Sequence, residues 1–196
     1  MSEIRQLIAD ERHELATLLK DLSPEQWDAP SLCEGWRVRE VVAHLTAPYR
    51  HSTARIVLEL IKSGGRMNPM LDRLARRDAT EHTPAELADC LAANVNHPWK
   101  PPGDGFQAAL SHDVIHGLDI TVALGIDRRV PVERVGVVLA GMNPKTLKFF
   151  NVDLTGIQLR ATDLDWSYGT GSQVISAPAA DLLLKVCGRS VPGPLN

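Results

Sequence analysis

The feature that most constrains the fold is a series of amphipathic helical segments within the first 125 residues. Apolar residues recur three and four positions apart with charged residues between them, which is the spacing of an α-helix with one buried face. The predicted helices cover residues 3–21, 37–65, 70–79, 84–96 and 106–124. Pro48 should kink or divide the second of these. The four longer segments suffice for a four-helix bundle, so we expect a mainly α protein.

The pattern changes near residue 128. Residues 132–150 still favour helix, whereas residues 155–178 contain alternating and β-branched runs interrupted by Gly-Thr-Gly. Such a pattern is typical of short antiparallel strands joined by a turn. A last helix is expected over residues 179–188. We therefore predict a helical bundle over residues 1–128 and a small α+β domain over residues 129–196 that docks on the bundle, because so short a unit buries little surface alone.

Composition and charge narrow the class of partner. The formal net charge is -3 with no long basic run, so nucleic-acid binding is not expected and a small-molecule partner is favoured. The first twenty residues are charged throughout, and no window approaches eighteen uninterrupted apolar residues, so we expect a cytoplasmic protein without a membrane span. The three cysteines, Cys33, Cys90 and Cys187, form no C-x-x-C pair and are expected as free thiols.

Two histidines in the stretch SHDVIHGLD are the clearest chemical signal. His112 and His116 are four residues apart, so on a helix they point the same way one turn apart. His44, in the apolar run VVAHL, is expected to face the interior from another helix. Three buried imidazoles need partners for their ring nitrogens, and a divalent cation would supply one. Zinc suits three neutral histidines best, with nickel or iron less favoured, although hydrogen-bonded core histidines without metal remain an alternative.

The other candidate groups are given less weight. Cys33 could be a nucleophile, but a structural role is favoured for a single cysteine in a loop. Asp113 and Asp119 could orient a metal ligand, but exposed helix charges are the favoured interpretation. The remaining histidines are expected to be solvated; they are His13, His51, His82 and His97.

The segment LSPEQWDAPSLCEGWRVREVVAHL, residues 22–45, resembles the N-terminal signature of the mycothiol-dependent maleylpyruvate isomerase family, which belongs to the DinB-like four-helix bundles. The matching positions are Trp27, Pro30, Cys33, Gly35, Trp36, Val38, His44 and Leu45. The block HDVIHGLDI is similar to the family's other metal motif, and residues 166–189 look like its C-terminal domain.

The resemblance implies a divalent metal held by His44, His112 and His116, with a mycothiol-like low-molecular-weight thiol as cosubstrate. In the isomerase the position matching His112 is a glutamate, whereas the three-histidine thiol transferases of the superfamily have histidine there. A thiol transferase, or an enzyme for another electrophile, therefore fits at least as well as maleylpyruvate isomerisation. The family's C-terminal arginine is matched best by Arg189, which could clamp a substrate carboxylate or simply be a cation at a helix end.

Taken together, the sequence predicts a metal- and thiol-dependent transferase or isomerase. A coordinated thiol loses its proton at neutral pH and can then attack an electrophilic carbon. Two alternatives stay open: a hydrolase in which the metal activates water, and a protein that binds a metal or small ligand without turnover. The electrophile, the thiol, the metal in the cell and the oligomeric state, monomer or homodimer, are left undetermined.

Overall fold

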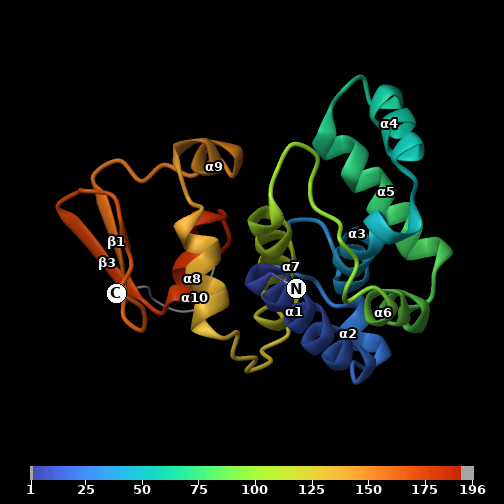
Figure 1. Cartoon of the computed structure of the whole chain (residues 1–196), viewed down its shortest axis with the longest axis horizontal. Helices are drawn as coiled ribbons and strands as arrows, with labels where there is room; N and C mark the ends of the chain where they lie inside the picture. The colour runs from blue at the N-terminus through green and yellow to red at the C-terminus, as the bar shows by residue number, and fades with distance from the viewer. Residues whose placement is uncertain (1, 191–196) are drawn as a thin grey trace.

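The computed structural model describes residues 2–190 and shows a mainly helical protein with a small three-stranded sheet near its C-terminal end (Figure 1). The expected fold class, helices followed by a small α+β part, is confirmed. Residues 191–196 of the predicted C-terminal domain lie outside the described residues.

Four helices pack around the apolar core of the N-terminal part. They are α1 (Glu3–Lys20), α3 (Val38–Arg50), α6 (Pro84–Ala93) and α7 (Phe106–Thr121). Helices α1 and α3 each pack against both α6 and α7. Their facing apolar side chains are almost fully buried, as Leu15, Val41 and Leu87 illustrate. This arrangement sets α3 directly against α7, the two helices that carry the candidate metal ligands.

Three further helices lie around this group: α2 (Pro24–Asp28), α4 (Thr53–Lys62) and α5 (Met67–Glu81). Pro48 lies inside the last turn of α3, and the chain leaves the helix after Arg50 before α4 begins, so the predicted division occurs. Helix α5 packs on α3, while α4 contacts α5 and stands away from the rest of the molecule (Figure 1).

The C-terminal part begins with α8 (Val132–Ala140) and α9 (Pro144–Phe149) and ends with α10 (Ala179–Val186). Between them lie β1 (Ile157–Ala161), β2 (Ser167–Tyr168) and β3 (Gln173–Ala177), with β1 in the centre of the sheet. The pair β1–β2 is antiparallel as predicted, but β1 and β3 are parallel. The prediction of an antiparallel sheet is therefore wrong for one of its two pairs.

Because β2 and β3 lie on opposite sides of β1, the chain that leaves β2 must pass β1 before β3 begins. Gly169 and Gly171 lie at this crossing, and a Cβ atom at either would collide with the backbone of Gly156 or Ile157. Gly169 also has a positive φ of 86°, a conformation that glycine adopts without strain. The Gly-Thr-Gly motif is thus a backbone crossing and not a hairpin turn.

A single apolar cluster joins the two parts of the chain. Leu110 and Val114 of α7 pack in it with Leu139, Leu159 and Leu182 from the C-terminal part. Helices α8 and α10 both contact α7 on the side away from α3 (Figure 1). Helix α7 therefore belongs to both halves of the core, and the division at residue 128 stays a prediction.

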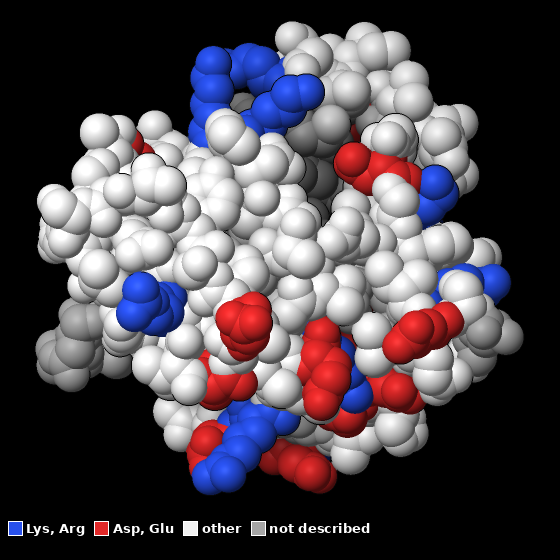
Figure 2. Space-filling view, turned by 60° about the vertical axis from the view of Figure 1, so that its left-hand side comes forward, with Lys and Arg blue, Asp and Glu red and all other residues white. Residues whose placement is uncertain are grey.

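The surface in Figure 2 carries acidic and basic side chains intermingled in its lower part, and its basic side chains form small separate groups. This face offers no broad basic area for a phosphate backbone. Among the helices between residues 2 and 190, none combines the length and the apolar character needed to span a bilayer.

The shared core predicts a large cost for truncating Leu182, which is fully buried. Leu182→Ala should lower the free energy of unfolding by about 2–5 kcal/mol, because the change removes buried methyl groups and leaves a cavity. Leu58→Ala is the matched control, since Leu58 is 46% exposed, and it should change stability by less than about 0.5 kcal/mol. Urea unfolding measures both; equal effects of the two substitutions would contradict the shared core.

Candidate metal centre

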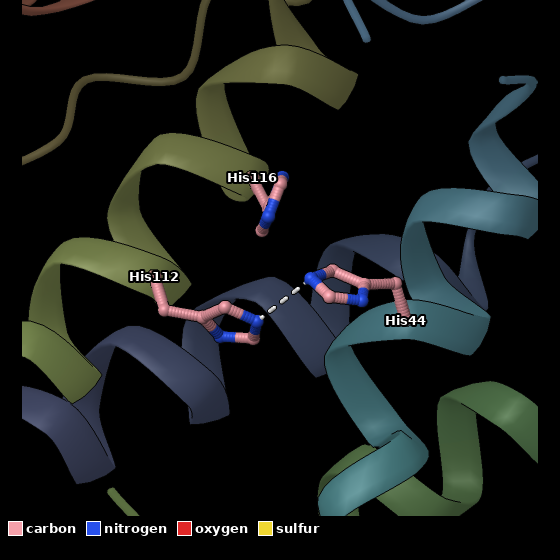
Figure 3. A group of neighbouring side chains, drawn as sticks. All are labelled: His44, His112 and His116. Carbon is pink, nitrogen blue, oxygen red and sulfur yellow. Dashed lines mark hydrogen bonds between the residues drawn. The ribbon is translucent and has the colours of Figure 1, made fainter. Parts of the chain in front are cut away.

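Helices α3 and α7 bring the three predicted histidines together. His112 and His116 project from the same face of α7 toward His44 on α3 (Figure 3). Nε2 of His112 lies 3.2 Å from Nε2 of His44. One ring nitrogen from each of the three histidines lies within 4.8 Å of the other two. The predicted ligands thus converge on one small region between two helices.

Buried apolar side chains lie next to the histidines on both helices that carry them. Val42 and Leu45 beside His44, and Val114 and Leu118 on α7, are at most 3% exposed. The histidines themselves are less enclosed, because the side chains of His112 and His116 are each 14% exposed. The site therefore has an apolar base, and its two α7 histidines are partly exposed.

A buried carboxylate holds the other nitrogen of each α7 histidine. Nδ1 of His112 lies 3.0 Å from Oδ1 of Asp113, and Nδ1 of His116 lies 3.0 Å from Oδ2 of Asp119. Since an ionised carboxylate can only accept, each Nδ1 carries a proton, and in the neutral imidazole Nε2 then keeps the lone pair. Asp113 and Asp119 are 1% and 0% exposed, so the favoured interpretation as exposed helix charges is wrong.

The environment favours the neutral imidazole at His44 and His112. Burial, together with the neighbouring His116 and His112, holds the pKa of His44 well below its ordinary value of 6.5. Burial also lowers the pKa of His112, although Asp113 acts in the opposite direction. Neutral imidazole is the form that binds metals. At neutral pH these two side chains are therefore in the ligand state.

An arginine holds each carboxylate in turn. Nε of Arg12, on α1, donates to Oδ2 of Asp113 at 2.6 Å. Arg189, which follows α10, donates from Nε to Oδ1 of Asp119 at 2.8 Å and from Nη2 to Oδ2 at 3.0 Å. Burial opposes ionisation of Asp119, but the hydrogen bonds from His116 and Arg189 outweigh it and lower the pKa of the carboxyl. Asp119 is thus held charged beside His116, and Asp113 is bonded to Arg12 beside His112.

Arg12 was not singled out from the sequence, although a signal was present. It continues the apolar stripe formed by Ile8, Leu15 and Leu19, and it is 1% exposed. A cation on the buried face of a helix needs a buried anion. That requirement could have pointed to Asp113.

The structure places the guanidinium of Arg189 against the carboxylate of Asp119. Its Nη1 donates to the carbonyl oxygen of Cys187 at 3.1 Å, within the turn that ends α10, as expected of a cation at a helix end. Its Nη2 also lies 3.4 Å from Sγ of Cys33. The alternative role as a clamp for a substrate carboxylate stays a prediction.

Cys33 lies in the loop between α2 and α3 and reaches the same carboxylate. Its Sγ donates to Oδ2 of Asp119 at 2.9 Å. Burial, and then the negative charge of Asp119, raise the pKa of the thiol. Cys33 is therefore a protonated hydrogen-bond donor, which agrees with the favoured structural role.

Cys33, His116 and Asp119 form a second group whose ligand atoms lie within 4.8 Å of one another. This group already surrounds a cation, because Arg189 lies within 3.4 Å of both the sulfur and the carboxylate. A metal ion there would be repelled by the guanidinium. The three-histidine group is the better candidate.

Two tryptophans form walls beside the histidines. The ring centroids of Trp36 and His44 are 5.3 Å apart, and those of Trp99 and His112 are 5.0 Å apart. Nε1 of Trp36 donates to Asp72 on α5 at 2.8 Å, which fixes its ring. Trp99 comes from the proline-rich loop before α7 and was not identified from the sequence as part of a site.

The remaining histidines are not part of this cluster. His13 is exposed as predicted. His51 differs from the prediction, because its Nε2 lies 2.6 Å from Asp78 and its side chain is only 15% exposed. His97 is half-buried and accepts a hydrogen bond from the backbone of Trp99. His82 is half-buried at the end of α5.

The fold and the cluster define a mainly helical protein with a candidate three-histidine metal centre. Residues 8–100 match the family model described as the mycothiol maleylpyruvate isomerase N-terminal domain. The expected resemblance to the mycothiol-dependent maleylpyruvate isomerase family is thereby confirmed.

Two crystal structures share the fold over nearly the whole chain. A structure of the mycothiol-dependent maleylpyruvate isomerase is 16% identical with a TM-score of 0.54, covering 98% of this chain and 94% of that one. A histidine-to-alanine variant of that enzyme is 15% identical with a TM-score of 0.50 over the same shares. At this identity the likeness shows the fold.

Curated relatives match only part of the chain. A "Putative metal-dependent hydrolase" of Bacillus cereus strain G9842 is 28% identical over 94 residues, 48% of this chain and 54% of that protein. A protein of the same description from Bacillus mycoides strain KBAB4 is 27% identical over the same shares. The chain thus spans about half the length of the curated relatives it matches.

The lowered pKa of His44 predicts a loss of stability in acid for the metal-free protein. The folded-state pKa lies below the ordinary 6.5, so the unfolded state binds more protons between the two values and stability falls as the pH drops below 6.5. His44→Asn should reduce the loss of stability between pH 7.5 and pH 5.5, because it removes this titrating group. His13→Asn, at an exposed position, is the control. Urea unfolding in chelator tests this; an unchanged pH dependence in His44→Asn would refute it.

Proposed function

We propose that the chain binds one divalent metal ion through Nε2 of His44, His112 and His116. Zinc is the favoured ion, with nickel and iron as alternatives. The observation that carries the proposal is the 3.2 Å separation of Nε2 in His44 and His112. Two nitrogen ligands of a tetrahedral zinc ion with bonds of about 2.0–2.1 Å are separated by about 3.3 Å.

The carboxylates support the same assignment. Zinc-binding histidines characteristically donate their other ring nitrogen to a carboxylate or carbonyl, which fixes the tautomer and the ring orientation. Asp113 and Asp119 accept from His112 and His116 in this way. Core histidines without metal are the alternative, in which the same 3.2 Å contact is a hydrogen bond between His44 and His112.

The site is suited to catalysis because its ligand set is incomplete. Within residues 2–190 the converging group holds three histidines and no fourth ligand side chain. Three protein ligands leave a coordination position for water or substrate, whereas structural zinc sites use four. His112 and His116 are each 14% exposed, so the proposed site is not sealed from solvent.

We therefore propose a metal- and thiol-dependent transferase or isomerase. A bound divalent metal would supply stabilisation of a thiolate at neutral pH. The attacking sulfur has to come from a cosubstrate, because burial keeps Cys33 protonated on Asp119. The family match and the shared fold support a mycothiol-like thiol as that cosubstrate.

In this reaction the sulfur of the thiol bonds to one carbon of a conjugated double bond, the π bond of that double bond opens, and the substrate takes up the proton that the thiol has lost. Release of that adduct makes the protein a transferase; rotation followed by elimination of the thiol makes it an isomerase. Asp113 and Asp119 keep the protons on Nδ1 of the two α7 histidines. The rings of Trp36 and Trp99 lie beside those of His44 and His112.

A hydrolase is the second candidate, favoured by the description of the Bacillus relatives. The same open position would then hold water, whose pKa zinc lowers to about 7. A protein that binds the metal without turnover is the third. Thiol dependence and turnover separate the three.

The metal assignment predicts binding of one equivalent of zinc. His116→Ala should weaken zinc binding by more than the roughly 10–100-fold that follows loss of a ligand's hydrogen-bond partner, because it removes a ligand itself. His13→Ala, on the exposed face of α1, should bind zinc as wild type does. Titration of chelator-treated protein measures this; wild-type affinity in His116→Ala would remove the site.

The thiol assignment predicts thiol-dependent turnover of an electrophile. Wild-type protein should consume thiol in a panel of electrophiles with a product of the summed mass, or isomerise a conjugated double bond with the thiol recovered. His116→Ala should reduce the rate to background, since the thiolate is no longer stabilised. Hydrolysis of esters or amides without thiol would favour the second candidate, and thiol turnover that survives the substitution would contradict the proposal.

A further inference from the structure

Asp119 is the point at which three separate segments meet the histidine cluster. Its side chain is fully buried and contacts His116 of its own helix, Cys33 of the loop before α3, and Arg189 after α10. Its carbonyl oxygen also accepts the backbone N–H of Leu32 at 3.0 Å. The carboxylate is therefore shared between a candidate metal ligand and parts of the chain far away in sequence.

We infer that Arg189 is a positioning residue, which fixes His116 through Asp119 and so makes metal affinity depend on the docking of the C-terminal part. This inference rests on the metal site proposed above. It assigns the C-terminal part a role at the site that the packing of the core alone would not require.

The first step is the orientation of the imidazole. The torsion of a histidine ring about its Cβ–Cγ bond is broad and only weakly restricted by sterics. The hydrogen bond from Nδ1 of His116 to Asp119, at 3.0 Å, sets both the ring plane and the tautomer. The direction of the Nε2 lone pair thus depends on where the carboxylate lies.

The second step is the orientation of the carboxylate. Arg189 engages both oxygens of Asp119, Oδ1 at 2.8 Å and Oδ2 at 3.0 Å. A bidentate guanidinium fixes a carboxylate in its plane, which a single hydrogen bond does not. Cys33 adds a third bond to Oδ2 at 2.9 Å. Asp119 consequently has little freedom to rotate while Arg189 is in place.

The third step is the position of Arg189 itself. It follows α10, whose Leu182, Leu183 and Leu184 are fully buried in the core shared with α7. Helix α10 lies against α7 on the side away from α3 (Figure 1). Displacement of α10 would carry the guanidinium away from Asp119. Docking of α10, the carboxylate and His116 are thus linked in one chain of contacts.

The other α7 histidine provides an internal comparison. His112, Asp113 and Arg12 form the same histidine–carboxylate–arginine arrangement, but there the arginine comes from α1. A buried ion pair seldom adds net stability over apolar packing. Stability alone therefore does not explain two such arrangements. Since each ends at one of the converging histidines, orientation of these candidate ligands explains them better.

The coupling must act in both directions. If docking of the C-terminal part strengthens metal binding, metal binding strengthens that docking by the same factor. Metal should therefore slow local opening of α10 beyond any general stabilisation of the fold. This gives a readout that does not depend on catalysis.

The test compares Arg189→Met with Arg134→Met. Arg134, on α8, also joins the C-terminal part to α1, through Glu11 at 2.9 Å and Glu14 at 2.6 Å, and it is 5% exposed, but it contacts none of the three histidines. Arg189→Met should weaken zinc binding about 10–100-fold, the usual cost of losing a ligand's supporting contacts. Arg134→Met should change it less than about threefold, and Arg189→Lys should recover part of the affinity because an ammonium can bond one oxygen.

Hydrogen exchange provides the second readout. Zinc should slow amide exchange in residues 179–189 of wild type and Arg134→Met, and this zinc-dependent slowing should be lost in Arg189→Met at saturating zinc. The wild-type measurement stands even where Arg189→Met does not fold. Absence of zinc-dependent slowing in a wild type that binds zinc would overturn the inference.

The outcomes separate the inference from the function on which it rests. Equal zinc affinities of Arg189→Met and Arg134→Met would overturn the positioning role and leave the three-histidine site intact. Loss of turnover in Arg189→Met with unchanged zinc affinity would also overturn it, and would assign the guanidinium to substrate. Failure of wild type to bind zinc would instead remove the proposed function.

Discussion

The hydrogen bonds from Nδ1 of His112 and His116 to two buried carboxylates are the interactions on which the rest of the site depends. They place both protons on the far side of the rings and leave two lone pairs facing His44. Without them, three neutral imidazoles could adopt several tautomers and orientations, and the cluster would have no defined ligand geometry. Arg12 and Arg189 in turn donate hydrogen bonds to Asp113 and Asp119.

Helix α7 can carry both the histidines and their buried carboxylates because other helices enclose it on two sides. Helices α1 and α3 pack against it from the N-terminal part, and α8 and α10 pack against it from the C-terminal part. Side chains that would otherwise meet water, such as Asp113 and Asp119, are buried by this enclosure and take partners from outside α7. The C-terminal part therefore contributes a polar contact to the site as well as apolar surface to the core.

Helical spacing and the four-residue separation of His112 and His116 were sufficient to predict the main helices and the convergence of the candidate ligands. The features that were missed depend on contacts between distant segments. Nothing local distinguishes Asp119 from an exposed helix charge, since its burial is created by the loop of Cys33 and by Arg189. The parallel pairing of β3 was likewise hidden, because Gly-Thr-Gly reads as a hairpin turn until the crossing over β1 is seen.

The most direct test of the account is X-ray absorption at the zinc edge of protein loaded with one equivalent of zinc and no added thiol. Three histidine ligands predict nitrogen scatterers at about 2.0–2.1 Å, with an oxygen completing the shell and no sulfur. A sulfur scatterer at about 2.3 Å would contradict the account, because it would place the metal in the group of Cys33, His116 and Asp119.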